Sequence, residues 1–143
     1  ALNGYTYMKG AWVMHTLRSA INDDTTWFAI LKEFMVENAK GHVSTEDFFD
    51  KVKEKTDTDY SYFSEQYFYT PNQPELEYYQ TDSSFYYRWN NVNDNFIMPM
   101  GLLINGVEKR VLPSQEFQSF DIRKHAAIEV MDWKFYVKPI QKK

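Results

Sequence analysis

Histidines and carboxylates are the first side chains to inspect for chemistry, because they supply most metal ligands and acid–base groups in proteins. The 143-residue chain contains three histidines, His15, His42 and His125. None of them belongs to an H-E-x-x-H zinc motif. His125 and Glu129 are four residues apart, but in a predicted loop or strand that spacing does not align side chains. The sequence therefore predicts no metal site in this chain, and His42 is interpreted as a solvated loop residue.

Nucleophilic and phosphate-binding motifs do not occur in the sequence either. Cysteine is absent, which excludes disulfides, thiolate metal sites and a cysteine nucleophile. No serine lies in a G-x-S-x-G elbow, and no glycine-rich phosphate loop is present. The net charge of −4 gives no basic field that would attract nucleic acid. No apolar run approaches the roughly 20 residues of a membrane span.

Aromatic residues are abundant, with 11 Tyr, 11 Phe and 4 Trp. Between residues 60 and 69 they recur at helical and adjacent spacings, for which core packing is the default interpretation. A sugar-binding platform is the alternative, and it requires several Tyr or Trp side chains in a solvent-facing row.

Tyr7 and Arg18 are the polar ends of one stripe on a helix predicted over about residues 6–21. Most faces of this helix are apolar, which is typical of a helix buried inside a larger body. Both polar side chains are then expected to be buried and to need partners. Periodicity alone favours a structural role for Tyr7.

The elements that position these residues divide the chain into two parts, an α+β organisation. Residues 1–75 have helical periodicity, and the predicted helices cover about 6–21, 25–39, 44–56 and 58–69. Asp24 is expected to cap the second helix, and Ser44 or Thr45 the third. Residues 76–143 contain short strand-like runs, at 76–80, 84–91, 96–105, 108–113, 118–122 and 133–140. With a hairpin turn at Asn105-Gly106, they predict a small β-sandwich.

The order of these motifs resembles the aminopeptidase N family of zinc metallopeptidases, the gluzincins, and bacterial members in particular. Residues 7–18, YMKGAWVMHTLR, are similar to the family's Y-x-K-G-A…L-H-x-L-R segment. Residues 43–78 resemble its T-x-E-D-F stretch and its D-Q-W-L-Y-x-P-G-x-P-x-L-x-Y ending. YYRWNN and FIMPMGLLINGVEKRVLPS, at 86–91 and 96–114, resemble the small β-domain that follows. Nearly the whole chain is covered.

The resemblance implies that residues 1–75 are the C-terminal helical part of a thermolysin-like catalytic domain and residues 76–143 an immunoglobulin-like β-sandwich. In the family, zinc is held by H-E-x-x-H and a downstream Glu, which lie upstream of this segment. Tyr7 matches the family's catalytic tyrosine, whose phenol donates a hydrogen bond to the oxyanion beside the metal. The chain departs from the family pattern at Met8, Asn22, Tyr67 and Asn72. These departures leave an altered substrate preference open.

The expected function is therefore that of a fragment of a zinc aminopeptidase that hydrolyses N-terminal peptide bonds. No cofactor is expected in this chain, and zinc is expected in the parent enzyme, so that the isolated chain would be inactive. Its expected partners are a peptide substrate in the parent and the upstream catalytic half of the same polypeptide. The isolated fragment is expected to self-associate through an exposed apolar patch. The alternative is a non-catalytic binding or scaffolding module from a metallopeptidase-like parent. The compartment stays open, with the periplasm and secretion among the options.

Overall fold

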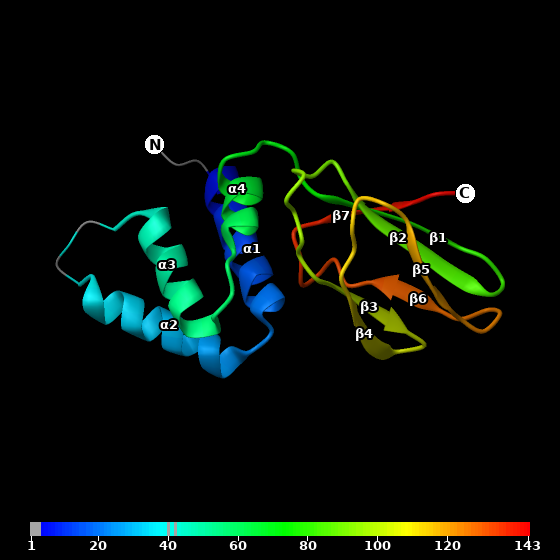
Figure 1. Ribbon diagram of the computed structural model, residues 1–143, viewed down its shortest axis with the longest axis horizontal. Helices are drawn as coiled ribbons and strands as arrows, with labels where there is room; N and C mark the ends of the chain where they lie inside the picture. Colours follow the sequence, from blue (N-terminus) through cyan, green and yellow to red (C-terminus); the bar gives the residue numbers. More distant parts are fainter. Residues whose placement is uncertain (1–3, 40, 42) are drawn as a thin grey trace.

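Helices come first along the chain and strands follow, in a computed structural model that describes residues 4–39, 41 and 43–143, with side chains from Lys9 onward. The helices are α1 (Gly4–Ile21), α2 (Asp24–Glu37), α3 (Thr45–Thr56) and α4 (Ser61–Phe68). The strands are β1 (Glu75–Gln80), β2 (Ser84–Asn90), β3 (Met100–Ile104), β4 (Val107–Val111), β5 (Gln118–Asp121), β6 (Ile128–Val130) and β7 (Lys138–Gln141). Helices and strands occupy opposite ends of the molecule, an α+β arrangement (Figure 1). None of the described helices is long and apolar enough to cross a membrane.

Side-chain caps set the start of two helices. Ser44 accepts a hydrogen bond from the Asp47 amide, and the Asp47 carboxylate accepts one from the Ser44 amide, both at 3.1 Å. This confirms the predicted start of α3. The predicted cap of α2 is wrong by one residue, because Asp23 accepts from the Thr26 amide at 3.1 Å. Asn22 ends α1 with a left-handed φ of 56°, so that Asp23 is the extended residue available to cap.

The described strands form two sheets with the orders β5-β2-β1-β7 and β4-β3-β6. Strands β3 and β4 form the predicted hairpin, in which Asn105 and Gly106 have φ values of 49° and 81°. The strand predicted over 133–140 is wrong in its first half, since only Lys138–Gln141 pair, parallel to β1. The segment 133–137 instead forms turns, and one of its amides bonds to α1. Strand β6 was not predicted.

One hydrophobic cluster runs through both sheets and the helices. Its members from the two sheets include Leu76, Phe85, Trp89, Met100 and Leu102. The Trp89 indole donates a hydrogen bond to the Met98 carbonyl at 3.0 Å, which satisfies its polar group inside the core. Three of the four tyrosines between residues 60 and 69 are buried in this cluster: Tyr60, Tyr62 and Tyr67. Core packing therefore accounts for them, and they form no solvent-facing platform.

Glu77 is a carboxylate with only 2% of its surface exposed, on β1. One of its oxygens accepts hydrogen bonds from Arg88 at 2.8 and 3.1 Å, and the other pairs with Lys142 at 2.7 Å. The bonds from Lys142 and Arg88 hold the pKa of Glu77 below its ordinary value, against the opposing effect of burial. The three side chains link β1 to β2 and to the C-terminal end of the chain.

We expect Glu77→Gln to lower the free energy of unfolding by about 1–2 kcal/mol at neutral pH, because it removes charge-assisted bonds to partly exposed partners. A group with a lowered folded pKa stabilises the fold above its unfolded pKa, near 4.5 in this case, and loses that contribution as the pH falls through the folded pKa. Urea unfolding should therefore show a difference between wild type and variant that shrinks in acid. Glu116→Gln, at an exposed position, is the control. A pH-independent difference would contradict this role of Glu77.

Candidate functional site

Helix α1 carries the catalytic candidate Tyr7, but the side chain of this residue lies outside the described part of the structure. Further along the helix, Val13 and Leu17 face the core, whereas Ala11 and His15 are exposed. The helix is therefore not buried on all sides in this chain. The role of Tyr7 stays a prediction that rests on the sequence resemblance.

The expectation that Arg18 is buried is wrong. Its side chain is 39% exposed and forms two parallel bonds to Asp24, at 2.8 and 2.9 Å. The hydrogen bond to Asp24 raises the pKa of Arg18, and the same bond lowers the pKa of Asp24. Both groups are therefore charged at neutral pH, and the pair joins the last turn of α1 to the first turn of α2.

A buried threonine ties α1 to the strand-forming half of the chain. The hydroxyl of Thr16 donates to the Trp12 carbonyl and accepts from the Tyr136 amide, both at 2.7 Å. The Tyr136 carbonyl accepts from the phenol of Tyr67 on α4, at 2.9 Å. Burial raises the pKa of Tyr67 well above its ordinary value, which keeps this phenol protonated as a donor. The backbone at Tyr136 therefore links α1 and α4, and it restricts the rotation of the helix that carries Tyr7.

A buried glutamine makes a second link between the two halves. The amide nitrogen of Gln66 on α4 donates to the Asn72 carbonyl at 2.9 Å, and its amide oxygen accepts from the Asn93 amide at 2.7 Å. The Gln66 side chain is fully buried, and both of its bonds lie in partly buried surroundings. It lies in the segment that resembles the family's Q-W-L-Y motif, but no sequence pattern indicates these two partners.

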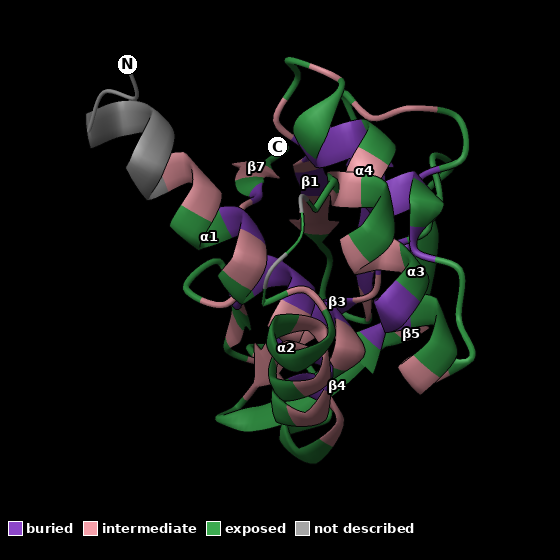
Figure 2. Ribbon diagram, turned by 90° about the vertical axis from the view of Figure 1, so that its left-hand side faces the viewer, coloured by how far each residue is buried: buried purple, intermediate pink, exposed green. Residues whose placement is uncertain are grey.

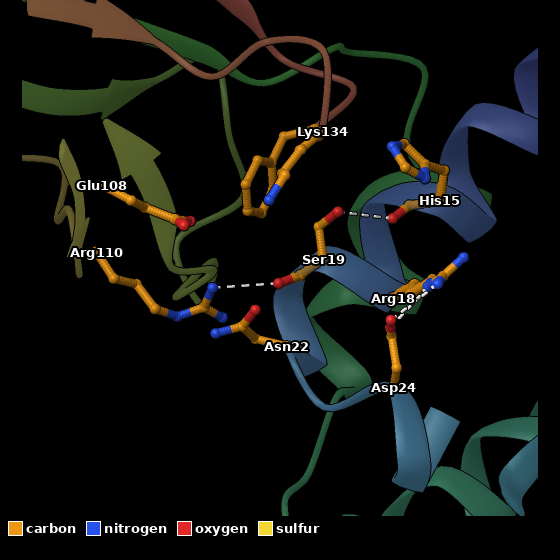
Figure 3. Close-up of a pocket in the computed structure, with 9 residues that line it drawn as sticks. His15, Arg18, Ser19, Asn22, Asp24, Glu108, Arg110 and Lys134 are labelled. Atoms are coloured by element: carbon orange, nitrogen blue, oxygen red, sulfur yellow. Dashed lines mark hydrogen bonds and ion pairs between the residues drawn. The ribbon is translucent and has the colours of Figure 1, made fainter. Parts of the chain in front are cut away.

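A cavity of about 420 Å³ lies between the end of α1 and the strands (Figure 3). The residues that line it come from α1, the start of α2, β4 and the connection between β6 and β7: His15, Arg18, Ser19, Asn22, Asp24, Glu108, Arg110, Lys134 and Phe135. Its volume falls within the range of roughly 300–1,000 Å³ that is typical of small-molecule sites. Eight of the nine lining residues have charged or polar side chains, and Phe135 is the apolar one.

Arg110 caps the C-terminal end of α1 from the facing strand β4. Its guanidinium donates to the Ser19 carbonyl at 3.1 Å and also to the Ala20 carbonyl. Figure 3 shows the first of these bonds crossing one side of the cavity. The last carbonyls of a helix lack partners within the helix and carry its negative dipole end, which an arginine satisfies. None of these cavity residues was predicted as a site residue: His15 and Arg18 were considered only as a histidine and as a buried polar group on the first helix, and Arg110, Lys134 and Glu108 lie in no motif.

The remaining histidines do not assemble a catalytic or metal centre in the described structure. His125 is an exposed residue with a φ of 66°, and His42 lies outside the described residues. Among the side chains that the structure describes, no group of three or more His, Cys, Asp or Glu could hold a metal ion. The described cavity offers charged and polar side chains that a ligand could contact.

Comparisons with known proteins give a structural likeness without a sequence match. No protein-family model matches the chain, and no curated protein matches it. Among solved structures, the chain is similar to aminopeptidase A of Legionella pneumophila, solved in complex with aspartic acid, with a TM-score of 0.74 and 17% sequence identity. The likeness covers 99% of this chain and 18% of the Legionella chain. It shows a fold that is shared with part of an aminopeptidase structure.

Proposed function

We propose that this chain is the C-terminal part of a zinc-dependent aminopeptidase of the gluzincin, aminopeptidase N-like type. In this proposal, residues 1–75 complete the helical side of the catalytic domain, and residues 76–143 are an immunoglobulin-like β-sandwich behind it. The upstream part of the same polypeptide would hold the zinc ion and the residue that activates its water. Tyr7 would supply the oxyanion-stabilising phenol.

The observation that carries this proposal is the fold likeness to an aminopeptidase over 99% of the chain, taken with the Tyr7-Met8-Lys9-Gly10 match to Y-x-K-G. Fold alone does not specify function, because one fold supports many activities. The short motif adds a residue with a defined chemical role at the start of a helix. The β-sandwich assignment is supported by two sheets that share one hydrophobic cluster.

Exposed apolar side chains support the requirement for an upstream half. On the outer face of α2, Phe28 is 54% exposed and Met35 and Val36 are each 70% exposed. Figure 2 looks at this end of the molecule and shows α2 with exposed and half-buried positions facing the viewer. Trp12, on α1, is 39% exposed. Apolar surface of this kind is typical of contact with another body, and the proposed catalytic half would cover it.

The direct test compares this chain with a polypeptide that also contains its upstream sequence. We expect the isolated chain to bind no stoichiometric zinc and to hydrolyse no aminoacyl-p-nitroanilide, because its ligands would lie upstream. The longer polypeptide should bind one zinc ion and turn over. Metal analysis after dialysis and a chromogenic assay measure both. Tightly bound zinc with turnover in the isolated chain would contradict the proposal.

A non-catalytic binding or scaffolding module remains the alternative, and the same comparison separates the two. No family model matches the chain, and it is only 17% identical to the aminopeptidase structure. Both findings are compatible with a parent protein whose sequence has diverged from that of active aminopeptidases. A longer polypeptide that folds but binds no zinc, and whose upstream sequence lacks H-E-x-x-H, would support the scaffold. An intact motif with metal-dependent turnover would support the enzyme.

A further inference from the structure

A polar residue interrupts the buried apolar stripe of α1. Val13, Leu17 and Ala20 are buried on the side of the helix that faces the core. Thr16 lies in the same stripe, three residues after Val13 and four before Ala20, and it is fully buried. Apolar contacts are not directional, so that the three apolar side chains alone permit α1 to slide or rotate against the core. A satisfied buried hydrogen bond in the stripe fixes one arrangement.

The partner of Thr16 belongs to the connection between β6 and β7, which the strand half holds at both ends. The Met131 amide donates to the Gly101 carbonyl on β3 at 3.1 Å, and the Lys138 amide donates to the Pro74 carbonyl before β1 at 2.9 Å. Between these anchors, the amide of residue 136 donates to the Thr16 hydroxyl at 2.7 Å. The strand half therefore determines where α1 can place Thr16.

Two further contacts hold the same connection against the helices. The phenol of Tyr67 on α4 donates to the Tyr136 carbonyl at 2.9 Å. Nε2 of His15 on α1 lies 3.2 Å from the Trp133 carbonyl. Residue 136 is thus fixed by α4 through its carbonyl, while its amide fixes α1 through Thr16.

The constraint at Thr16 reaches Tyr7 through the helix that carries both residues. At about 1.5 Å and about 100° per residue, their backbone positions lie about 13 Å apart along the axis, on opposite sides of the helix. Because a helix moves as one element, a rotation or shift at Thr16 changes the position of every residue on α1. A displacement of about 1 Å at a reacting group can lower a rate about 10²-fold.

We propose that Thr16 is a positioning residue, through which the strand half of the chain sets the rotation and the axial position of the helix that carries Tyr7. The inference rests on the proposed function, in which the Tyr7 phenol donates to the oxyanion. Thr16 lies at the unspecified position of L-H-x-L-R, so that the family resemblance assigns it no role. The strand half then contributes to catalysis by supporting α1.

The test uses the longer polypeptide that contains the upstream sequence, with single and double variants. Thr16→Val removes the hydroxyl and keeps the branched shape, and we expect it to lower kcat at least about tenfold with KM within about twofold of wild type. Thr16→Ser restores the hydroxyl and should bring kcat to within about threefold of wild type. In a Tyr7→Phe background, Thr16→Val should change kcat by no more than about twofold, because the phenol that Thr16 positions is absent.

Thr56→Val on α3 is the matched control. The Thr56 hydroxyl also donates to the carbonyl four residues earlier, Val52, at 2.7 Å, and accepts from a backbone amide, that of Thr58, at 3.2 Å. These bonds stay at one end of α3, so that the variant should keep kcat within about twofold of wild type.

Tyr67→Phe is a second test variant, which keeps the ring and removes the bond to the Tyr136 carbonyl. It loosens the connection from the side of α4, and we expect it to lower kcat at least about threefold when Tyr7 is present and by no more than about twofold in the Tyr7→Phe background. It carries the test by itself if Thr16→Val does not fold.

All rates are expressed per folded, zinc-loaded molecule, so that a loss of stability alone does not count. An unaltered kcat in the folded test variants, an equal loss in the Tyr7→Phe background, or an equal loss in Thr56→Val would each overturn the positioning role and leave the proposed function intact. A wild-type polypeptide without zinc-dependent turnover, or a fully active Tyr7→Phe, would instead contradict the proposed function and the positioning role with it.

Discussion

Replacing Gln66 by leucine is expected to lower the free energy of unfolding by about 2–5 kcal/mol. The side chain is fully buried and holds the Asn72 carbonyl and the Asn93 amide at 2.9 and 2.7 Å. Leucine has a similar size but cannot bond to either group, so both backbone groups would lose their partner at a partly buried site. Each unsatisfied buried group costs about 1–3 kcal/mol.

Urea unfolding followed by tryptophan fluorescence measures this loss. The matched control is Gln73→Leu, in the same connection between α4 and β1, where the side chain makes no hydrogen bond within the described residues. The control should change the stability by no more than about 0.5 kcal/mol. Hydrogen exchange adds a local readout, because the Asn93 amide should lose protection in Gln66→Leu. If both variants lose the same small amount, Gln66 does not join the two halves as the structure indicates.

Local chemistry made several elements predictable from sequence. The serine and aspartate of the α3 capping box lie three residues apart, and the two residues of the β3–β4 turn are adjacent. Capping and turn signals of this kind depend only on residues that are neighbours in the chain. They can therefore be read from the sequence without knowledge of the tertiary structure. The same holds for the change from helical to strand-like periodicity near residue 75.

Distant contacts overrode the local pattern elsewhere. The apolar, aromatic run at 133–137 has strong strand propensity, but the Tyr136 amide is used by Thr16, a residue 120 positions away. Because this amide bonds to α1, the segment turns here and does not pair with another strand. Strand β7 therefore begins only at Lys138. Strand propensity is decided largely by tertiary context, which the sequence pattern does not contain.

The residues of the candidate site were even less predictable from the sequence than the strand at 133–137. The cavity combines the end of α1, β4 and the β6–β7 connection, and no short motif relates these three elements. Arg110 could be located at the α1 terminus only by the fold. Tyr7, in contrast, came from a short motif match alone, since helical periodicity favoured a structural role. Its function must therefore be tested by chemistry.

We expect Tyr7→Phe, made in a polypeptide that contains the proposed zinc-binding half, to lower kcat about 10²–10³-fold with little change in KM. Attack of zinc-activated water on a peptide carbonyl creates an oxyanion, and a phenol donor stabilises charge that exists only in the transition state. Removing such a donor lowers kcat and kcat/KM together, because ground-state binding is unchanged. Phenylalanine keeps the aromatic ring and removes only the hydroxyl.

Tyr5→Phe is the matched control, since it removes the same hydroxyl one half-turn away on α1. Its kcat should stay within about twofold of wild type if the hydroxyl of Tyr5 has no catalytic role. Zinc content and thermal stability must be equal in both variants, because a structural role for Tyr7 would appear as lost stability with unaltered kcat per folded molecule. The links from Thr16 and Arg110 fix α1 from the strand side, independently of the Tyr7 hydroxyl. A loss of kcat at constant zinc content and stability therefore identifies the phenol as the donor, and full activity of Tyr7→Phe excludes it.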